Sequence, residues 1–265
     1  MQIDENQNPF SLVADFEGDE SSVFEVDVDE TLPILPLRNM VLFPGVVMPV
    51  AVGRKSSLKL VKAAEKKNFH IGVVCQLTPE TDNPLFEDLY HVGTVAKIVK
   101  VLELPDQSIT VILQGMSRFE LSGIIEESPY LIGNAVKIND ELPAKDDAQY
   151  EILVESCREV TMKYIKMNEQ LPRESIFAIK NISNKTFLIN FICANFPFAI
   201  SRKMELLSEG SMVKRTEILL RQLNKEIQYA ELRAEIQRRT REDLDVQQKE
   251  YFLQQQIKNI QDELG

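Results

Sequence analysis

The chain has 265 residues, a formal net charge of −11 and only three cysteines. No apolar run approaches the ~20 residues that cross a bilayer. The start, MQIDENQNPF, has neither the basic and apolar regions of a signal peptide nor the arginines of a transit peptide. We therefore expect a cytoplasmic protein with no membrane partner.

The negative charge is concentrated at the N-terminus. Residues 1–31 contain ten acidic residues and no basic one, so the rest of the chain is nearly neutral. This composition predicts a disordered acidic tail over residues 1–31. Because nucleic-acid binding requires a net basic face, the nearly neutral remainder argues against nucleic acid as a partner.

The first apolar stretch, LPILPLRNMVLFPGVVMPVAVGR, predicts two strands joined through a turn. Residues 32–37 form a short strand interrupted by prolines, Phe43-Pro44-Gly45 forms the turn, and residues 46–52 form the second strand. Proline cannot donate a ladder hydrogen bond. These strands therefore belong at a sheet edge or a barrel rim.

The following residues extend this pattern to a mostly β domain. Residues 58–68 have helical spacing, and Ser56 or Ser57 can cap that helix. Further strands are predicted at 69–77, 93–104, 109–121 and 130–138, with a hairpin turn at 105–108. This number of short strands favours a barrel-like domain over residues 32–140, because closure removes exposed strand edges.

Two motifs in this region resemble the Lon protease N-terminal domain. The first joins LPILPLR, the apolar FPG turn and PVAVGR. The second joins GTVAKI at residues 93–98, ITVILQG at 109–115, and Arg118-Phe119. The resemblance covers residues 32–138 and implies a PUA-like β domain. It also implies the N-terminal region of a bacterial ATP-dependent serine protease that assembles as a homohexamer.

Beyond a polar boundary at residues 141–147, the apolar spacing changes from that of strands to that of helices. Helices are predicted at 149–167, 172–182, 185–195 and 201–210, the third capped at Ser183-Asn184 and the fourth at Ser201. We expect these helices to pack as a small bundle over residues 146–210. The chain is therefore predicted to have an α+β fold.

Residues 211–265 predict one very long helix, because no proline or glycine lies between Met212 and Leu264. A packing seam is predicted at Leu220, Leu223, Ile227, Ala230 and Ala234, and it fails in the polar stretch 237–243. Arg238, Arg239 and Arg241 in that stretch are expected to form i,i+4 ion pairs. Apolar spacing resumes at Leu253, Ile257, Ile260 and Leu264. We assign these four residues to oligomer assembly or to coupling with a further domain.

The sequence contains no recognisable catalytic machinery. No glycine stands in a G-x-x-x-x-G-K-[ST] phosphate loop, and no serine–lysine dyad can be identified. The widely spaced cysteines predict buried free thiols, the two histidines predict structural or surface roles, and no metal site is expected. By the resemblance, ATP and Mg²⁺ belong to an ATPase domain of a longer parent protein, of which we expect this chain to be the N-terminal piece.

The leading hypothesis is a non-catalytic region that recognises misfolded, damaged and short-lived regulatory proteins for a protease. An apolar groove with polar rims suits exposed apolar segments of such clients, and adaptable methionines suit varied ones. The candidate contact residues are Met40, Leu42, Phe43 and Met48, each of which could instead belong to the core. The alternative is a stand-alone adaptor that dimerises through its C-terminal helix. A nucleic-acid-binding PUA-like module is disfavoured, since the strands lack a basic cluster.

Overall fold

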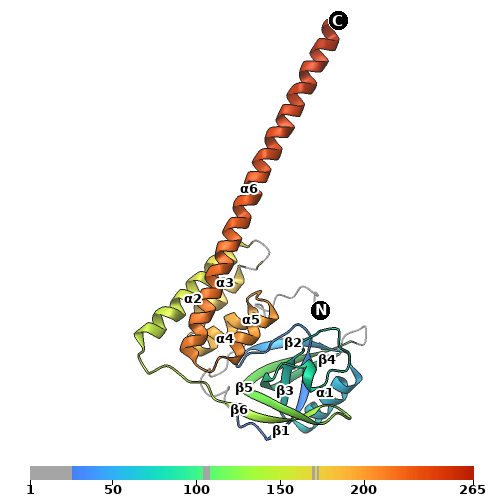
Figure 1. The fold of residues 1–265 in the computed structure, drawn as a ribbon, viewed down its shortest axis with the longest axis vertical. Helices are drawn as coiled ribbons and strands as arrows, with labels where there is room; N and C mark the ends of the chain where they lie inside the picture. The colour runs from blue at the N-terminus through green and yellow to red at the C-terminus, as the bar shows by residue number, and fades with distance from the viewer. Residues whose placement is uncertain (1–25, 104–107, 169–170, 172) are drawn as a thin grey trace.

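The computed structural model describes residues 26–103, 108–168, 171 and 173–265. A strand-rich domain is followed by a group of helices, and one long helix projects from them (Figure 1). The elements are β1 (Thr31–Leu37), β2 (Val47–Val52), α1 (Lys55–Lys67), β3 (Ile71–Cys75), the 3-10 turn η2 (Phe86–Asp88), β4 (Val92–Glu103), β5 (Ile109–Glu126), β6 (Ile132–Ile138), α2 (Ala148–Met167), α3 (Glu174–Asn181), α4 (Lys185–Asn195), α5 (Ile200–Ser208) and α6 (Met212–Leu264). The predicted α+β fold is confirmed.

One mixed sheet curls into a barrel. Its strand order is β2-β5-β4-β3-β1-β6, and β5 also pairs with β6. Strands β5, β4, β3, β1 and β6 therefore form a closed ring, and only the β1–β3 pair is parallel. Among the described residues, β2 pairs with the first half of β5 alone. The free edges of β2 and of the second half of β1 consequently flank a gap in the barrel.

Pro36 of β1 and Pro49 of β2 lie on these free edges, as the sequence predicted. Pro33 lies where β1 pairs with β6, so the predicted edge position holds only for the second half of β1. Residues 34–37 of β1 pair with β3 on one side. On the other side, the carbonyl of Pro36 accepts a hydrogen bond from Arg54 Nη1 at 3.3 Å. Because alternate residues of a strand face opposite neighbours, the register with β5 turns Pro49 of β2 toward its free edge. The missing N–H of Pro36 and of Pro49 therefore interrupts no ladder of backbone hydrogen bonds between strands.

Helix α1 begins earlier than predicted and has no serine cap. Arg54 is the N-cap residue, and no side chain accepts a hydrogen bond there, because Ser56 and Ser57 already lie in the first helical turn. The helix ends where Asn68 adopts a left-handed conformation with φ 53° and ψ 48°. Its apolar face packs into the barrel core with β1 to β5.

Two strands, β3 and β5, differ most from their predicted ranges. β3 is shorter than residues 69–77, and Gln76 continues only as an isolated bridge to Leu89. β5 runs past the predicted end at residue 121, because its second half pairs with β6. The predicted hairpin turn at 105–108 falls largely outside the described residues.

Helices α2 to α5 pack with the first part of α6, as predicted for a bundle. Asn184 caps α4, and its Oδ1 accepts a hydrogen bond from Phe187 N at 2.9 Å, as expected. The predicted cap at Ser201 is wrong, since α5 begins at Ile200 with Ala199 in the cap position. Asp147, which the sequence analysis placed in the boundary, caps α2.

Helix α6 is continuous over 53 residues, about 80 Å in length. It has no break near the polar stretch. Its first part buries Leu219, Leu223 and Ile227 against the bundle. The predicted seam is thus correct at Leu223 and Ile227 and at Leu220, which is partly buried against the bundle. It misses Leu219 and is wrong at Ala234, which is exposed beyond the end of the bundle.

The polar middle of α6 is supported by ion pairs within the helix. Arg238 Nη1 lies 2.8 Å from Glu242 Oε1, and Arg239 pairs with Glu235 in the same i,i+4 spacing. The predicted pairs are confirmed for these two arginines. Each such pair contributes only about 0.3–0.5 kcal/mol, so they favour the helix without anchoring it.

The acidic N-terminal segment joins the barrel earlier than predicted. Val26 N donates a hydrogen bond to Ser117 Oγ at 3.0 Å, and that hydroxyl donates to Val26 O at 2.9 Å. Val28 packs against the barrel core. Residues 26–31 therefore belong to the folded domain, which corrects the predicted tail over residues 1–31. The predicted disorder of residues 1–25 lies outside the described residues.

All three cysteines are buried free thiols, as predicted. Burial raises the pKa of Cys193 to about 12 and also raises the pKa of Cys157. Thiols in this state are poor nucleophiles and poor metal ligands. His91 is exposed and stacks on Phe86 with ring centroids 4.4 Å apart, which agrees with a surface role.

Gly115 allows the Phe43-Pro44-Gly45 turn to approach β5, and this contact can be tested. A Cβ at Gly115 would lie 2.2 Å from the Phe43 carbonyl oxygen, whereas a Cβ at Gly123 on the same strand meets no atom within 4 Å. We expect Gly115→Ala to lower the unfolding free energy by about 2–3 kcal/mol through overpacking. Gly123→Ala should change it by less than about 1 kcal/mol. Urea unfolding followed by circular dichroism measures both, and equal stabilities would contradict the close approach.

Candidate functional site

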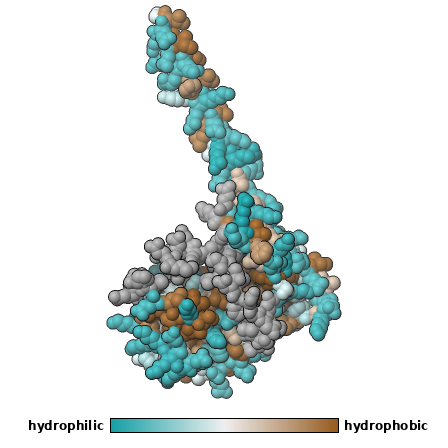
Figure 2. Space-filling model, turned by 180° about the vertical axis from the view of Figure 1, so that it is seen from behind, coloured by the Kyte–Doolittle hydropathy of each residue, from teal (hydrophilic) through white to brown (hydrophobic). Residues whose placement is uncertain are grey.

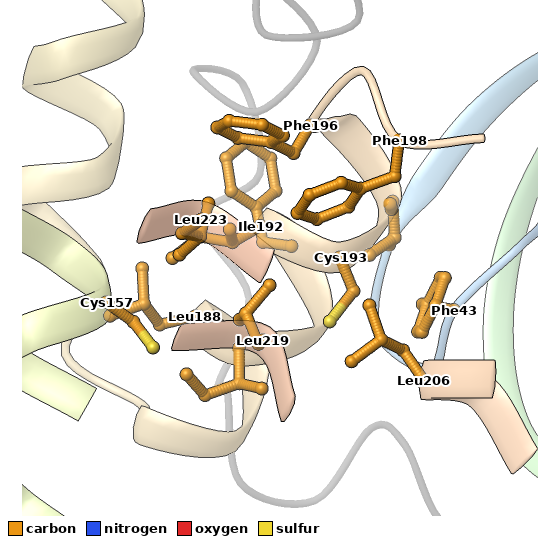
Figure 3. Close-up of a cluster of buried hydrophobic side chains, with 14 of the residues drawn as sticks. Phe43, Cys157, Leu188, Ile192, Cys193, Phe196, Phe198, Leu206, Leu219 and Leu223 are labelled. Atoms are coloured by element: carbon orange, nitrogen blue, oxygen red, sulfur yellow. The ribbon is translucent and has the colours of Figure 1, made fainter. Parts of the chain in front are cut away.

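Three of the four predicted client-contact residues lie in the core. Leu42, Phe43 and Met48 are 2%, 0% and 9% exposed. Leu42 and Met48 fill the barrel, and Phe43 packs at the junction with the helices, next to Leu206 (Figure 3). Because a buried side chain cannot contact a client without local unfolding, we withdraw these three residues. Met40 is partly exposed and lines a groove.

This groove has a volume of about 1050 Å³ and occupies the gap between β1 and β2. Its walls comprise residues 35–38, 50–53, 54–57, the loop residues Asp82 and Asn83, and the turn at 127–129. A second hollow of about 310 Å³ shares several of these residues and extends toward the β5–β6 turn. The LPLR and VGR parts of the first sequence motif therefore face one groove, which the sequence alone did not indicate.

Arginine side chains organise the wall of the groove. Arg38 Nη2 pairs with Asp82 Oδ1 at 2.7 Å at the exposed rim. Arg54 lies deeper, where its guanidinium donates to the Pro36 carbonyl and to the Gln76 side chain. Burial, and secondarily the charge of Arg38, lowers the pKa of Arg54 from its ordinary value. Arg54 is therefore committed mainly to holding the strand edge in place.

Two lysines at the start of α1 complete the rim. Lys55 and Lys59 are exposed and line the groove. Neither forms an ion pair within the part of the chain that the structure describes. The first turn of α1 contains no acidic residue. The groove therefore presents free positive charge next to apolar wall residues.

A second feature, which we call the buried charge cluster, joins the barrel to the helices. It consists of Arg118 from β5, Asp140 from the connection after β6, and Arg215 from α6. Asp140 Oδ1 lies 2.6 Å from Arg118 Nη2 and 2.7 Å from Arg215 Nη2. Both arginine side chains are fully buried, whereas the aspartate side chain is 22% exposed. Burial and the neighbouring Arg215 lower the pKa of Arg118, and Asp140 opposes that change.

Further hydrogen bonds extend the cluster across the molecule. Arg118 Nη1 donates to the Leu207 carbonyl of α5 at 2.7 Å. Arg215 Nη1 donates to Asn190 Oδ1 at 3.0 Å, and Asn190 Nδ2 donates to the Pro44 carbonyl at 3.2 Å. The cluster thus connects a barrel strand, the FPG turn, two bundle helices and the base of α6.

The apolar core continues through the same junction. One buried cluster contains barrel residues Val41, Phe43 and Val46 together with the apolar faces of α2, α4, α5 and α6. Figure 3 shows Phe43 beside Leu206, with Cys193 and Phe198 further into the helical side. Barrel and bundle therefore form one packed body, from which α6 projects.

The outer part of α6 carries an exposed apolar stripe (Figure 2). It includes the four residues predicted for assembly or coupling, Leu253, Ile257, Ile260 and Leu264, all of them exposed. The stripe also includes Tyr229, Leu232, Ile236 and Val246, which the sequence analysis missed. All eight residues lie on one repeat that alternates spacings of three and four residues, provided that the polar positions 239, 243 and 250 are included. The sequence therefore contained the pattern that identifies the whole stripe.

The stripe faces away from the bundle-packing side of α6. At about 100° per residue, its positions lie roughly opposite the face that buries Leu219, Leu223 and Ile227. One helix therefore has an inner face for its own bundle and an opposite outer face without a partner among the described residues. Such a repeat over several turns is typical of a helix–helix seam.

The described part of the chain contains no group of three His, Cys, Asp or Glu side chains arranged to hold a metal ion. None of its helices combines the length and apolar character needed to cross a membrane. The features that stand out are thus a groove, a charged junction and an apolar stripe.

Two solved structures with a similar arrangement are Lon N-terminal domains. The N-terminal domain of Mycobacterium avium complex Lon protease superposes with a TM-score of 0.58 at 15% identity, covering 73% of this chain and 98% of that one. The Lon N-terminal domain protein from Xanthomonas campestris gives a TM-score of 0.51 at 19% identity, covering 72% and 96%. At these identities the likeness establishes the fold.

Sequence comparison establishes the family. The model of the ATP-dependent protease La (LON) substrate-binding domain matches residues 31–225, so the chain belongs to this family. The Lon protease of Parabacteroides distasonis is 50% identical over 238 residues, which are 90% of this chain and 29% of that protein. The Lon protease of Flavobacterium johnsoniae is 43% identical over 247 residues, which are 93% and 30%. The chain thus spans about 30% of the length of these relatives and corresponds to their substrate-binding region.

Proposed function

We propose that this chain is the non-catalytic substrate-recognition and assembly region of an ATP-dependent Lon serine protease. The family match over residues 31–225 carries the proposal. The parent protein would degrade misfolded, damaged and short-lived regulatory proteins in the bacterial cytoplasm, as a homohexamer. ATP and Mg²⁺ would serve the ATPase domain of that parent, and this region would need no cofactor, nucleic acid or membrane.

Client recognition is assigned to the barrel. Unfolded segments differ from folded surfaces in exposing apolar side chains in extended chain. The groove between β1 and β2 offers the accessible apolar side chains of Pro36 and Ala51, and Met40 at its margin can adapt to different side chains. Met40 is the one residue of the original four that remains a candidate contact.

The buried charge cluster links the barrel mechanically to the base of α6. Because Arg118 and Arg215 share Asp140, the barrel and the base of α6 are held together at close range. A helix of about 80 Å converts small rotations of its base into large displacements of its far end. In this proposal, α6 couples the client-holding body to the rest of the protease.

A binding comparison tests the recognition proposal. Reduced, carboxymethylated α-lactalbumin is permanently unfolded, and the native form of the same protein is the matched control. Fluorescence anisotropy of labelled client should show binding at least about tenfold tighter for the unfolded form. Equal affinities for the two forms, or no binding of either, would contradict a role in recognising unfolded clients.

The apolar stripe predicts self-association or docking through α6. Ile257→Glu with Ile260→Glu places charges in the C-terminal part of the stripe and should dissociate an α6-mediated oligomer, because buried uncompensated charge opposes a helix seam. Gln255→Glu with Asn259→Glu adds the same charge on the opposite side of the helix and should leave assembly unchanged. Sedimentation of each variant measures this. An oligomer that resists the stripe substitutions would contradict the assignment of the stripe to assembly and leave coupling to a further domain.

The stand-alone adaptor remains the second candidate, and the stripe is the observation that favours it. A helix with a long exposed repeat can dimerise without any protease domain. Immunodetection of the native polypeptide in lysate separates the two functions. A product much longer than 265 residues that is labelled by an ATP analogue supports the protease, and a product of this length supports the adaptor.

A further inference from the structure

The strand edges beside the groove are poorly suited to pairing with a continuous strand. On β1, Pro36 has no N–H and its carbonyl is already bound by Arg54. On β2, Pro49 likewise faces the free edge. Because strand addition depends on a regular series of backbone hydrogen bonds, neither edge supports a full ladder. Recognition in the groove must therefore rely on side chains.

The side chains that remain available are basic and apolar. Arg38 and Asp82 neutralise each other at the rim, and the guanidinium of Arg54 is used within the wall. Lys55 and Lys59 remain exposed, with Glu127 as the other acidic lining residue besides Asp82. The lining includes four basic and two acidic side chains, so its net charge is positive.

The apolar residues that line the groove are near these charged residues in the sequence. Leu35, Leu37, Val50 and Val52 belong to the lining but are buried in the barrel core. The apolar side chains that a client can reach are those of the partly exposed Pro36 and Met40 and of the exposed Ala51. Gly53 leaves open space in front of the strand end, since a Cβ there would meet nothing within 4 Å. The open space at Gly53 therefore lies next to the lysines at the rim of the groove.

We propose that this groove binds an extended client segment in which acidic side chains alternate with apolar ones. The inference rests on the proposed client-recognition function and adds a substrate class to it. Apolar side chains of the client pack against the strand-edge wall, and its carboxylates pair with Lys55 and Lys59. The partner is chosen by charge complementarity, which sets specificity more than affinity.

The test uses labelled disordered peptides of equal length in which Leu and Ser alternate with Glu, with Gln or with Lys. Anisotropy titrations with the full chain should give tightest binding for the Glu peptide, with an affinity that falls as salt is added. Lys55→Glu with Lys59→Glu should weaken binding of the Glu peptide by about tenfold. Lys62→Glu with Lys66→Glu on the same helix lies outside the groove and should have little effect.

The outcomes separate this inference from the proposed function. If Glu and Gln peptides bind equally while unfolded α-lactalbumin still binds, the acidic preference is overturned and the proposed function stands. If unfolded α-lactalbumin and all peptides fail to bind, both are overturned. If the Glu peptide binds only after deletion of residues 1–25, which carry seven acidic residues, the occupant is the chain's own acidic segment and the inference is overturned.

Discussion

Asp140→Asn is expected to lower the free energy of unfolding by about 3–5 kcal/mol, because it leaves two buried guanidinium groups without their shared carboxylate. Arg118 and Arg215 have fully buried side chains and lie 2.6 and 2.7 Å from Asp140 Oδ1. Neither can regain its hydration without opening the junction between the barrel and α6. Urea unfolding monitored by circular dichroism gives the free energy, provided that the variant unfolds in one transition.

Asp82→Asn is the matched control for this prediction. It removes the carboxylate of the Arg38 pair, whose side chains are 45% and 85% exposed, with the same chemical change. Exposed pairs contribute about 0–1 kcal/mol, so the control should remain close to the parent chain in stability. If the two variants lost similar amounts, the shared carboxylate would not be what holds the junction. The nearby Leu207 and Glu209 carbonyls would then suffice for the arginines.

Phe43→Ala is expected to cost about 3–5 kcal/mol, because it removes a fully buried ring from the junction between barrel and bundle. Phe177→Ala is the control, since that ring is 72% exposed and its loss should change stability by less than about 0.5 kcal/mol. Both can be measured by the same unfolding experiment.

This prediction also decides the role first given to Phe43. A variant that stayed as stable as Phe177→Ala but lost binding of unfolded α-lactalbumin would restore Phe43 as a client-contact residue. A destabilised variant that binds normally below its unfolding transition would confirm the core assignment.

The sequence predicted those features that depend on local pattern. Pro36 and Pro49 indicated the free edges of β1 and β2, the strand and helix periods separated barrel from bundle, and the absence of proline and glycine after Met212 predicted α6. Each of these follows from backbone chemistry within a few residues. The Lon motifs then indicated the family correctly.

The groove and the buried charge cluster could not be predicted in this way. Arg118 finds its carboxylate 22 residues away, and Arg215 finds the same carboxylate 75 residues away. The apolar pattern also could not distinguish buried Phe43 from partly exposed Met40, because both lie in one apolar stretch and only packing with the bundle separates them. Such features arise when distant segments meet.

Recognition of unfolded clients by the barrel is tested most directly by hydrogen–deuterium exchange of the full chain with and without unfolded α-lactalbumin. We predict slower exchange in β1, β2 and the first turn of α1, which line the groove, and little change along the outer part of α6. Protection confined to residues 229–264, with the barrel unchanged, would contradict recognition by the barrel and favour an adaptor that acts through its helix.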